Sequence, residues 1–159
     1  MKTDLEIKPF ALFDKEWALL TAGDINNHNS MTISWGGMGT LWSKPVVTVY
    51  VKPIRYTHDF MENNDYFVIS FFEEQYRKAL VVMGSKSGRN INKDKEAKLT
   101  PIEHNKAIIY KEAKVTIICK KIYQNDLNIN NIPDAAISTY YKAEKPHTMY
   151  IGEVVEILK

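Results

Sequence analysis

The stretch from Asn29 to Thr57 constrains the fold of this chain more than any other. Small polar residues alternate with larger apolar ones over Ser30–Trp35, the period of two expected of a strand with one buried face. Glycines and a Lys-Pro step follow, and Val46–Val51 is then a β-branched apolar run typical of a buried strand. We expect a short middle strand that carries Thr40, Trp42 and Ser43. Three strands at hairpin spacing predict an antiparallel sheet.

Shorter signals predict the other elements. Residues 1–14 are interpreted as an arm that Pro9 keeps extended where it meets the domain. Further strands are predicted at Trp17–Ala22, Tyr66–Phe72 and Met149–Leu158, and a strand pair at Ala107–Tyr110 and Lys114–Tyr123. Helices are predicted at His58–Asn63, capped by Thr57, at Glu74–Met83, ended by Gly84, and, as a short helix or loop, at Pro133–Tyr141. Gly152 in the last strand predicts a bulge or a close backbone approach.

Six or seven strands with two or three short helices, in no regular alternation, predict a mainly β protein. The expected architecture is an antiparallel sheet closed or half-closed into a barrel. The chain has 159 residues, no internal repeat and no linker-like composition, so we expect one domain over residues 1–159.

Composition excludes several classes of protein. The net charge is +2, from 21 basic and 19 acidic residues, which argues against a dedicated nucleic-acid or membrane-surface binder. The single cysteine, Cys119, lies in an apolar strand pattern and is expected to be an inert core residue. Neither a secretory signal nor an apolar run of membrane-spanning length is found, so a cytoplasmic location is the expectation.

Two short segments carry groups that suit a phosphate. Gly84–Arg89 supplies two glycines, two hydroxyls and two cations, and Arg55–Thr57 supplies an arginine beside a hydroxyl. A phosphomonoester has three acceptor oxygens and about −1.5 to −2 charges, which suits arginine, hydroxyls and amides together. Taken singly, Gly84–Arg89 is more simply a solvated loop, Arg55 an ion-pairing surface residue and Thr57 a helix cap. The presence of both segments on one small domain favours a phosphate site.

Other chemistries lack their sequence patterns. The four histidines have no metal-ligand spacing, no G-x-S-x-G motif is present, and Gly36–Gly39 lacks both dinucleotide-binding spacing and a following helix. The charge run Lys93–Glu96 is most simply a solvated helix face. Trp35 and Trp42 are more often core or interface aromatics than cofactor-stacking ones, although neighbouring hydroxyls leave that question open.

Four segments in order resemble one family. Asn29–Gly37 with Lys44-Pro45, Arg55–Thr57, Ser85–Arg89 with Lys93, and Ile151–Val154 resemble the flavin reductase-like family of FMN-binding split barrels, which includes flavoredoxin. The resemblance runs from Trp17 to the end of the chain. The chain departs from the family at Asn92, where many relatives have aspartate, and residues 124–147 align with no functional feature.

The resemblance implies a six-stranded antiparallel split barrel with short peripheral helices, and a homodimer with FMN in a groove at the interface. It places the flavin ring against the strand that carries Asn29, Ser30, Met31, Thr32, Ser34 and Trp35. It places Trp42, Ser43 and Tyr56 beside the ring or the ribityl chain. It assigns the phosphate to Arg55, Thr57, Ser85 and Lys86, with Ser87 beside them.

The resemblance further implies an oxidoreductase that accepts a hydride from NADH or NADPH on bound FMN and passes electrons to bound or free flavin. No acid–base residue is expected, because the cofactor carries the chemistry. Two alternatives remain open: an electron carrier like flavoredoxin, which exchanges electrons with a partner protein, and a flavin-binding module without activity. His147 and Tyr150 would shape substrate access if they lay over the groove, although packing roles are simpler.

Overall fold

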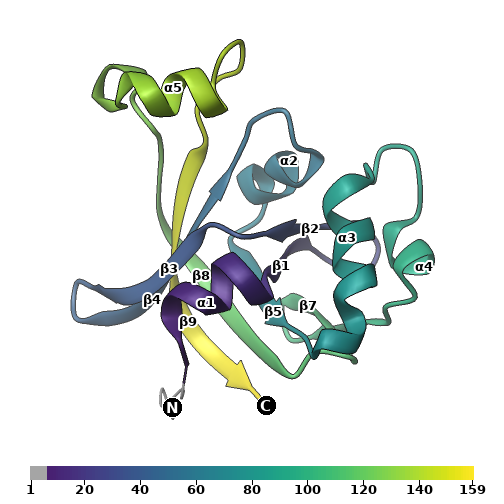
Figure 1. Cartoon of the computed structure of the whole chain (residues 1–159). Helices are drawn as coiled ribbons and strands as arrows, with labels where there is room; N and C mark the ends of the chain where they lie inside the picture. Colours follow the sequence, from purple (N-terminus) through teal and green to yellow (C-terminus); the bar gives the residue numbers. More distant parts are fainter. Residues whose placement is uncertain (1–6) are drawn as a thin grey trace.

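One strongly curved antiparallel sheet organises the molecule, a computed structural model that describes residues 7–159 (Figure 1). The sheet has seven strands in the order β2-β1-β5-β8-β9-β4-β3. Their bounds are β1 Ala18–Gly23, β2 His28–Ile33, β3 Gly36–Leu41, β4 Lys44–Val51, β5 Tyr66–Phe71, β8 Val115–Asp126 and β9 Thr148–Leu158. The predicted mainly β class is therefore confirmed, with seven strands in the sheet where the resemblance implied six.

Two predictions about strand pairing need correction. The segment Ala107–Tyr110 is a strand, β7, but it pairs with β6 (Pro101–His104) in a separate hairpin and not with β8. The strand β8 pairs instead with β5 and β9. Trp42 and Ser43 lie in no strand, because they form the two-residue turn between β3 and β4, where both have positive φ. That backbone matches the twist of a tight hairpin.

The inner face of the sheet encloses the main core. Alternate residues of β1, β2, β4, β5, β8 and β9 point into it, as the period of two requires, and Met38 of β3 packs against it. Helical residues from both ends of the sheet close it. Cys119 is buried there without a disulfide, and burial raises the pKa of its thiol, which confirms its prediction as a core residue. Gly152 faces Phe67 and Cys119 so closely that an added Cβ would lie 2.5 Å from the Phe67 ring, which confirms the predicted close approach.

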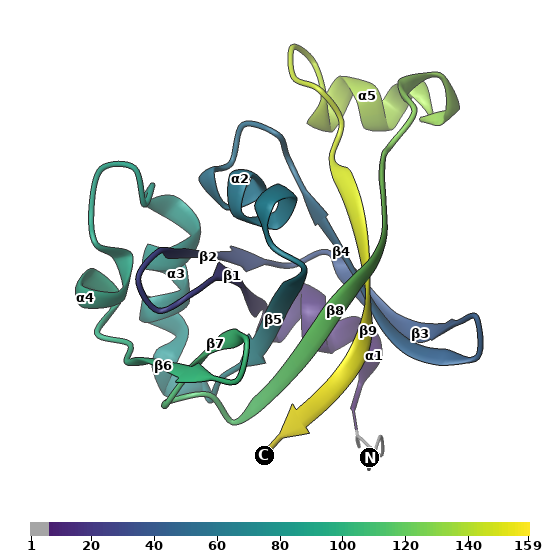
Figure 2. The ribbon, with the colours of Figure 1, turned by 180° about the vertical axis from the view of Figure 1, so that it is seen from behind.

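Short helices surround the sheet. α2 (Tyr56–Asn63) follows β4, and α3 (Arg77–Ser85) packs with α4 (Lys93–Ala97) on the outer face near β1 and β2 (Figures 1 and 2). A second apolar cluster, with Leu80, Met83 and Leu99, fills that contact. None of the helices in the described part of the chain has the length and apolar character to cross a membrane.

Three predicted helix boundaries differ from the structure. Pro9 begins a short helix, α1 (Pro9–Ala11), which continues as a π-helical turn and is not extended. Arg55 and not Thr57 occupies the N-cap of α2, and Thr57 lies inside the helix. Gly84 lies within α3, where an added Cβ would come 3.1 Å from the Thr32 side chain, so this glycine lets α3 approach β2 closely.

Residues 127–147, here called the α5 arm, leave the sheet between β8 and β9 and carry α5 (Asp134–Tyr140). The two strands extend beyond the rest of the sheet, and α5 lies at their far end in both views (Figures 1 and 2). This arm contains most of the segment that aligned with no functional feature in the sequence.

Candidate functional site

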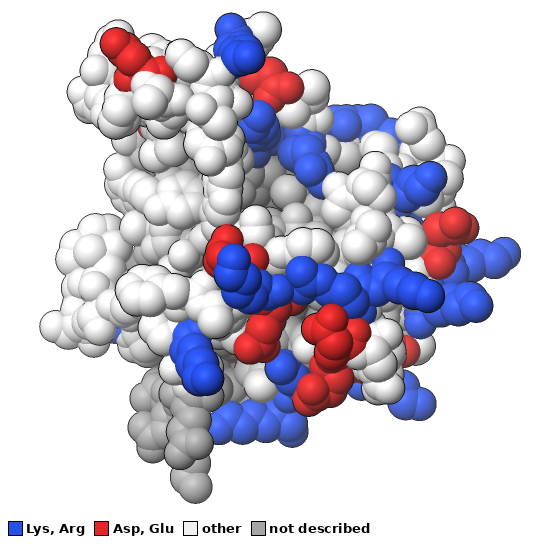
Figure 3. Space-filling model, viewed as in Figure 1, with Lys and Arg blue, Asp and Glu red and all other residues white. Residues whose placement is uncertain are grey.

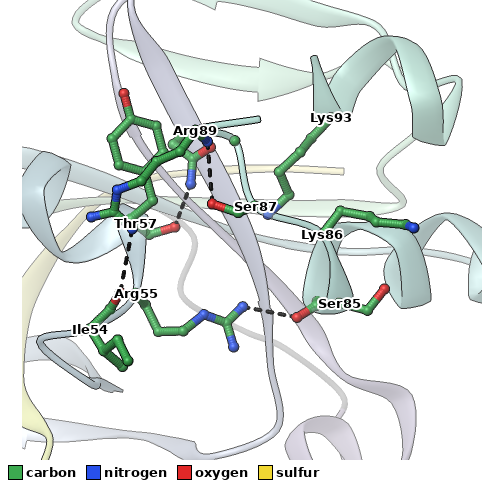
Figure 4. Close-up of a pocket in the computed structure, with 12 residues that line it drawn as sticks. Ile54, Arg55, Thr57, Ser85, Lys86, Ser87, Arg89 and Lys93 are labelled. Carbon is green, nitrogen blue, oxygen red and sulfur yellow. Dashed lines mark hydrogen bonds between the residues drawn. The ribbon is translucent and has the colours of Figure 1, made fainter. Parts of the chain in front are cut away.

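A cavity of about 260 Å³ lies where the start of α2, the end of α3 and the loop after α3 meet (Figure 4). We call it the basic cavity. It is lined by Asn29, Ile54, Arg55, Tyr56, Thr57, Gly84, Ser85, Lys86, Ser87, Gly88, Arg89 and Lys93. Arg55–Thr57 and Gly84–Arg89, the two predicted phosphate segments, are thus brought together although about thirty positions separate them.

The charged residues that line the basic cavity are all basic. Arg55, Lys86, Arg89 and Lys93 line it, and none of its described lining residues is acidic. Basic side chains border the hollow between α5 and α2 on the face shown in Figure 3. Arg89 is partly compensated at the rim, where it pairs with Asp59 at 3.2 Å and lies over the Tyr56 ring. An anion would relieve the repulsion among the remaining cations.

Arg55 holds two parts of this cavity together. Its guanidinium donates a hydrogen bond to the Gly84 carbonyl oxygen at 2.9 Å, and no carboxylate partner is recorded for it among the described residues. Burial lowers the pKa of Arg55, which still leaves an arginine charged at neutral pH. The expected alternative of a surface ion pair is therefore wrong for this residue.

Lys93 is a buried cation. The side chain points from α4 into the cavity, is 6% exposed, and donates to the Ser30 carbonyl oxygen at 2.5 Å (Figure 4). Burial, and next the charge of Arg55, lower the pKa of its ammonium group to about 8. Asp94 beside it is also half-enclosed, by His28 and Tyr110. The prediction of a solvated helix face at Lys93–Glu96 is therefore wrong for its first two residues.

A second cavity, of about 270 Å³, adjoins the first and shares Arg55 with it. We call it the aromatic cavity. It is lined by Met31, Thr32, Ile33, Ser34, Trp35, Tyr50, Lys52, Arg55 and His147. Because Arg55 lines both spaces, the two cavities lie next to each other beside β2, and we call them together the groove.

The α5 arm forms the far wall of the aromatic cavity. Tyr140 packs edge-on against Trp35 with ring centroids 5.0 Å apart, and the His147 ring lies 5.2 Å from the Trp35 ring. His147 Nδ1 shares a hydrogen bond of 2.7 Å with the Tyr141 hydroxyl. Burial and the charge of Lys52 lower the pKa of His147 to about 4, so this imidazole is neutral at physiological pH.

Several predicted site residues line the groove without offering their hydroxyls to it. The Thr32 hydroxyl donates to the Leu80 carbonyl oxygen, and the Ser85 hydroxyl donates to the Val81 carbonyl oxygen one helical turn back. Thr57 differs, because its hydroxyl accepts a hydrogen bond from the Asn29 amide at 2.8 Å and so keeps its own proton to donate. The Lys86 ammonium points away from Arg55 (Figure 4).

Three predicted residues are not brought to the groove. Ser30 shares a face of β2 with Thr32, but its side chain is buried farther along the strand, where its hydroxyl bonds with Thr21 and Tyr110. Trp42 and Ser43 lie in the β3–β4 turn, at the end of the sheet opposite to α3 (Figure 1). Within one chain they contact neither cavity, and their contact with a flavin stays a prediction.

Five residues that line the two cavities were not among the site residues predicted from the sequence. Arg89 and Lys93 lie in segments that the sequence analysis described, but Lys93 was expected in a solvated charge run and is buried. Tyr50 near the end of β4 and Lys52 just after it are two positions apart, the spacing that places both side chains on one side of an extended chain, and this signal was present in the sequence. His147 was considered for substrate access, and it does line the aromatic cavity.

The groove suits a planar ligand with a phosphate at one end. Residues 7–159 hold no cluster of three His, Cys, Asp or Glu side chains that would bind a metal ion. The basic cavity offers an anion site, and the aromatic cavity offers flat side chains beside the free edge of β2, an edge strand of the described sheet. In an antiparallel strand, the backbone N–H and C=O groups of residues two positions apart point to the same side. The backbone groups of Thr32 therefore point to the same open edge as the Ser30 carbonyl, which accepts a hydrogen bond from Lys93.

Comparison with known proteins agrees with this geometry. The model of the flavin reductase like domain matches residues 10–158. Flavoredoxin from Methanosarcina acetivorans has a TM-score of 0.72 at 18% identity, over 100% of this chain and 73% of that one. Flavoredoxin of Desulfovibrio vulgaris (Miyazaki F) has a TM-score of 0.71 at 24% identity, over 99% and 76%. The styrene monooxygenase flavin reductase from Pseudomonas putida S12 has a TM-score of 0.68 at 16% identity, over 94% of this chain and 82% of that one. No curated protein matches the chain.

Proposed function

Because this chain belongs to the flavin reductase-like domain family, we propose that it binds FMN in the groove and uses it as an NAD(P)H-dependent flavin reductase. One observation carries the flavin assignment: Arg55 joins a cavity with four cations and no acid among its described lining residues to a cavity with aromatic walls. A ligand that fills both must combine an anionic end with a flat ring, as FMN does. The printed names of the structural neighbours, flavoredoxins and flavin reductases, support the same choice.

The basic cavity would hold the phosphate. Arg55 and Lys93 are partly or fully buried, so their attraction to a dianion is less screened than that of surface cations. Arg89 would contribute from the rim. Burial is the main cause that lowers the pKa of Lys93, and a group with about −1.5 to −2 charges would also offset the smaller contribution, the repulsion from Arg55.

The aromatic cavity would hold the ring edge. The Thr32 backbone at the open edge of β2 would offer one donor and one acceptor, the pattern that a flavin pyrimidine edge requires. Trp35, Tyr140 and His147 would limit the access of water to this end of the groove. When bound, the flavin itself would accept the hydride and pass the electrons on. The protein's tasks are to orient the ring and to keep one face open, and neutral His147 adds no charge there.

An electron carrier is the second candidate. It is favoured by the α5 arm, whose Tyr140 packs on Trp35 at the boundary of the aromatic cavity and would restrict the approach of a nicotinamide. Such a carrier would exchange electrons with a redox partner protein in place of NAD(P)H.

We also propose a homodimer. Trp42 is 64% exposed in the β3–β4 turn, and Val155 on β9 is exposed as well, so apolar surface remains for a second copy. A second copy would be needed to bring Trp42 and Ser43 to a flavin. Light scattering during size-exclusion chromatography measures the mass directly, and a monomer at micromolar concentration would contradict this proposal.

A visible absorption spectrum of the purified protein with and without added FMN tests the proposed function. Anaerobic NADH and then NADPH are added to the loaded protein. Bleaching of the flavin bands by either nucleotide supports the reductase and identifies the donor. Bands that persist with both nucleotides favour the carrier, and absence of any flavin uptake rejects the site.

A further inference from the structure

We infer that the side chains of His28, Asp94, Tyr110 and Ser30 form a positioning network that holds the Lys93 ammonium in the wall of the basic cavity. This inference rests on the proposed function, because it assigns to the network control over the preference for phosphorylated over unphosphorylated flavin. None of the four side chains lines the basic cavity, so they act through Lys93.

The network is continuous. The His28 Nε2 lies 2.7 Å from one Asp94 carboxylate oxygen, and the Tyr110 hydroxyl donates to the other at 2.5 Å. The Tyr110 hydroxyl also lies 2.8 Å from the Ser30 hydroxyl. The Ser30 carbonyl then accepts from Lys93 at 2.5 Å. Strands β2 and β7 are thereby tied to α4 at the residue next to the lysine.

Helix α4 needs such an anchor. It has five residues, too few for a helix to be stable by itself, and it follows an irregular loop. The Asn92 side chain caps its start by accepting from the Lys95 N–H, and Ala97 and Leu99 bury its end. Asp94 adds a fixed point on the side that faces the sheet, so the neighbouring Lys93 is directed toward the cavity.

The charges of the network fit this role. Both ring nitrogens of His28 face acceptors, since Nδ1 lies 3.1 Å from the Asp24 carbonyl oxygen and Nε2 faces Asp94. A doubly protonated imidazole satisfies both acceptors. The Asp94 hydrogen bond is the main cause that raises the pKa of His28. Burial opposes ionisation of Asp94, but the hydrogen bonds from His28 and Tyr110 outweigh it and lower the pKa of this carboxyl.

Lys93 depends on these contacts because its own bonding is sparse. The Ser30 carbonyl is its one recorded acceptor among the described residues, and Arg55 repels it. A buried ammonium group so placed gains from any movement toward solvent. Loss of the Asp94 anchor would allow that movement and would withdraw one cation from the phosphate end of the groove.

The test compares the dissociation constants of FMN and riboflavin, which differ by the phosphate. We expect Asp94→Asn and Tyr110→Phe each to weaken FMN at least 10-fold and to leave riboflavin within twofold. Retained riboflavin binding shows that a variant is folded, and Tyr110→Phe keeps the buried ring if Asp94→Asn does not fold. His104→Gln, which breaks a histidine–carboxylate contact with Glu156 elsewhere on the sheet, is the matched control and should change neither constant.

A double mutant separates positioning from general stability. In a Lys93→Met background, Asp94→Asn should add no further loss of FMN affinity, because the residue through which it acts is gone. Equal losses for FMN and riboflavin, an unchanged ratio, or fully additive losses in the double mutant would each overturn the inference. If the unmodified protein bound neither flavin, the proposed function itself would fail, a result distinct from any of these.

Discussion

The Arg55 guanidinium and the Gly84 carbonyl oxygen lie 2.9 Å apart, and this hydrogen bond joins the start of α2 to the last turn of α3. Carbonyls in the last turn of a helix lack partners within the helix, and a cation near that end is favoured by the helix dipole. The bond therefore orients the arginine between the two cavities before any ligand is bound. Preorganisation of this kind reduces the entropy lost on binding.

Replacement of Arg55 by alanine should weaken FMN binding by about 10- to 100-fold, since a hydrogen bond to a charged group contributes about 1.5–3 kcal/mol. Riboflavin should weaken too, because the guanidinium also lines the aromatic cavity. Quenching of flavin fluorescence measures both constants. Lys44→Ala, which removes a surface cation paired with Glu153, is the control. Unchanged FMN affinity in Arg55→Ala would show that the phosphate binds elsewhere.

Replacement of Lys93 by methionine should stabilise the flavin-free protein and weaken FMN binding. The pKa of Lys93 is lowered from 10.5 to about 8, so folding at pH 7 requires burial of a charge that the unfolded chain keeps in water. We expect the free energy of unfolding at pH 7 to rise by about 2 kcal/mol, which is most of the energy that corresponds to this shift in the pKa of Lys93. The gain should shrink as the pH rises from 8 to 10.5, because the folded lysine then loses its proton first. Urea denaturation at several pH values measures it, and an equal or lower stability of the variant at pH 7 would contradict the prediction.

Replacement of His147 by glutamine should reduce the loss of stability in mild acid. Burial and the Lys52 charge lower the pKa of His147 from 6.5 to about 4, so between these values the unfolded chain binds a proton that the folded chain does not. Folding stability therefore falls as the pH falls through this window. The variant should lose about 2 kcal/mol less than the parent between pH 7 and pH 4. Parallel urea titrations at the two pH values are sufficient, and identical losses would exclude His147 as a contributor.

Replacement of Gly152 by alanine should destabilise the fold by about 1–3 kcal/mol, the range for overpacking of a filled core. The new Cβ would lie 2.5 Å from the Phe67 ring and 2.6 Å from the Cys119 Cβ, both fixed by neighbouring strands. Gly37→Ala is the matched control, because nothing lies within 4 Å of the Cβ position there. Thermal unfolding compares them, and equal midpoints would mean that the sheet adjusts without cost.

The strand pattern was the most readable part of the sequence. The alternation of Ser30 and Thr32 with Met31 and Ile33 correctly separated the two faces of β2, because side-chain direction in a strand depends on position alone. The alternation did not reveal which parts of the chain the polar face of β2 contacts. Ser30 and Thr32 bond with Tyr110 and with the Leu80 carbonyl, partners that are 80 and 48 positions away.

The pattern of charged residues along the sequence predicted burial least well. Lys93 and Asp94 were expected in solvent, since a short run of alternating charges is usually exposed. Their burial depends on the β6–β7 hairpin and on His28, which the run itself cannot reveal. Trp42 and Ser43 were expected in a strand for a similar reason, because no glycine or asparagine marked the tight turn that they form. The two segments predicted to bind a phosphate do line one cavity, and both combine cations with small residues at the ends of helices, while phosphate binding itself stays a prediction.

The ladder between β8 and β9 closes at the pair Asp126 and Thr148, and the α5 arm lies wholly beyond it. The sheet therefore imposes no length or sequence on residues 127–147 as long as their ends meet at that pair. Yet this segment supplies His147 to the groove and packs Tyr140 against Trp35, which lines the groove. We therefore expect that another segment of the same end-to-end reach could replace the arm, and so change one wall of the groove, while the sheet keeps its strand order.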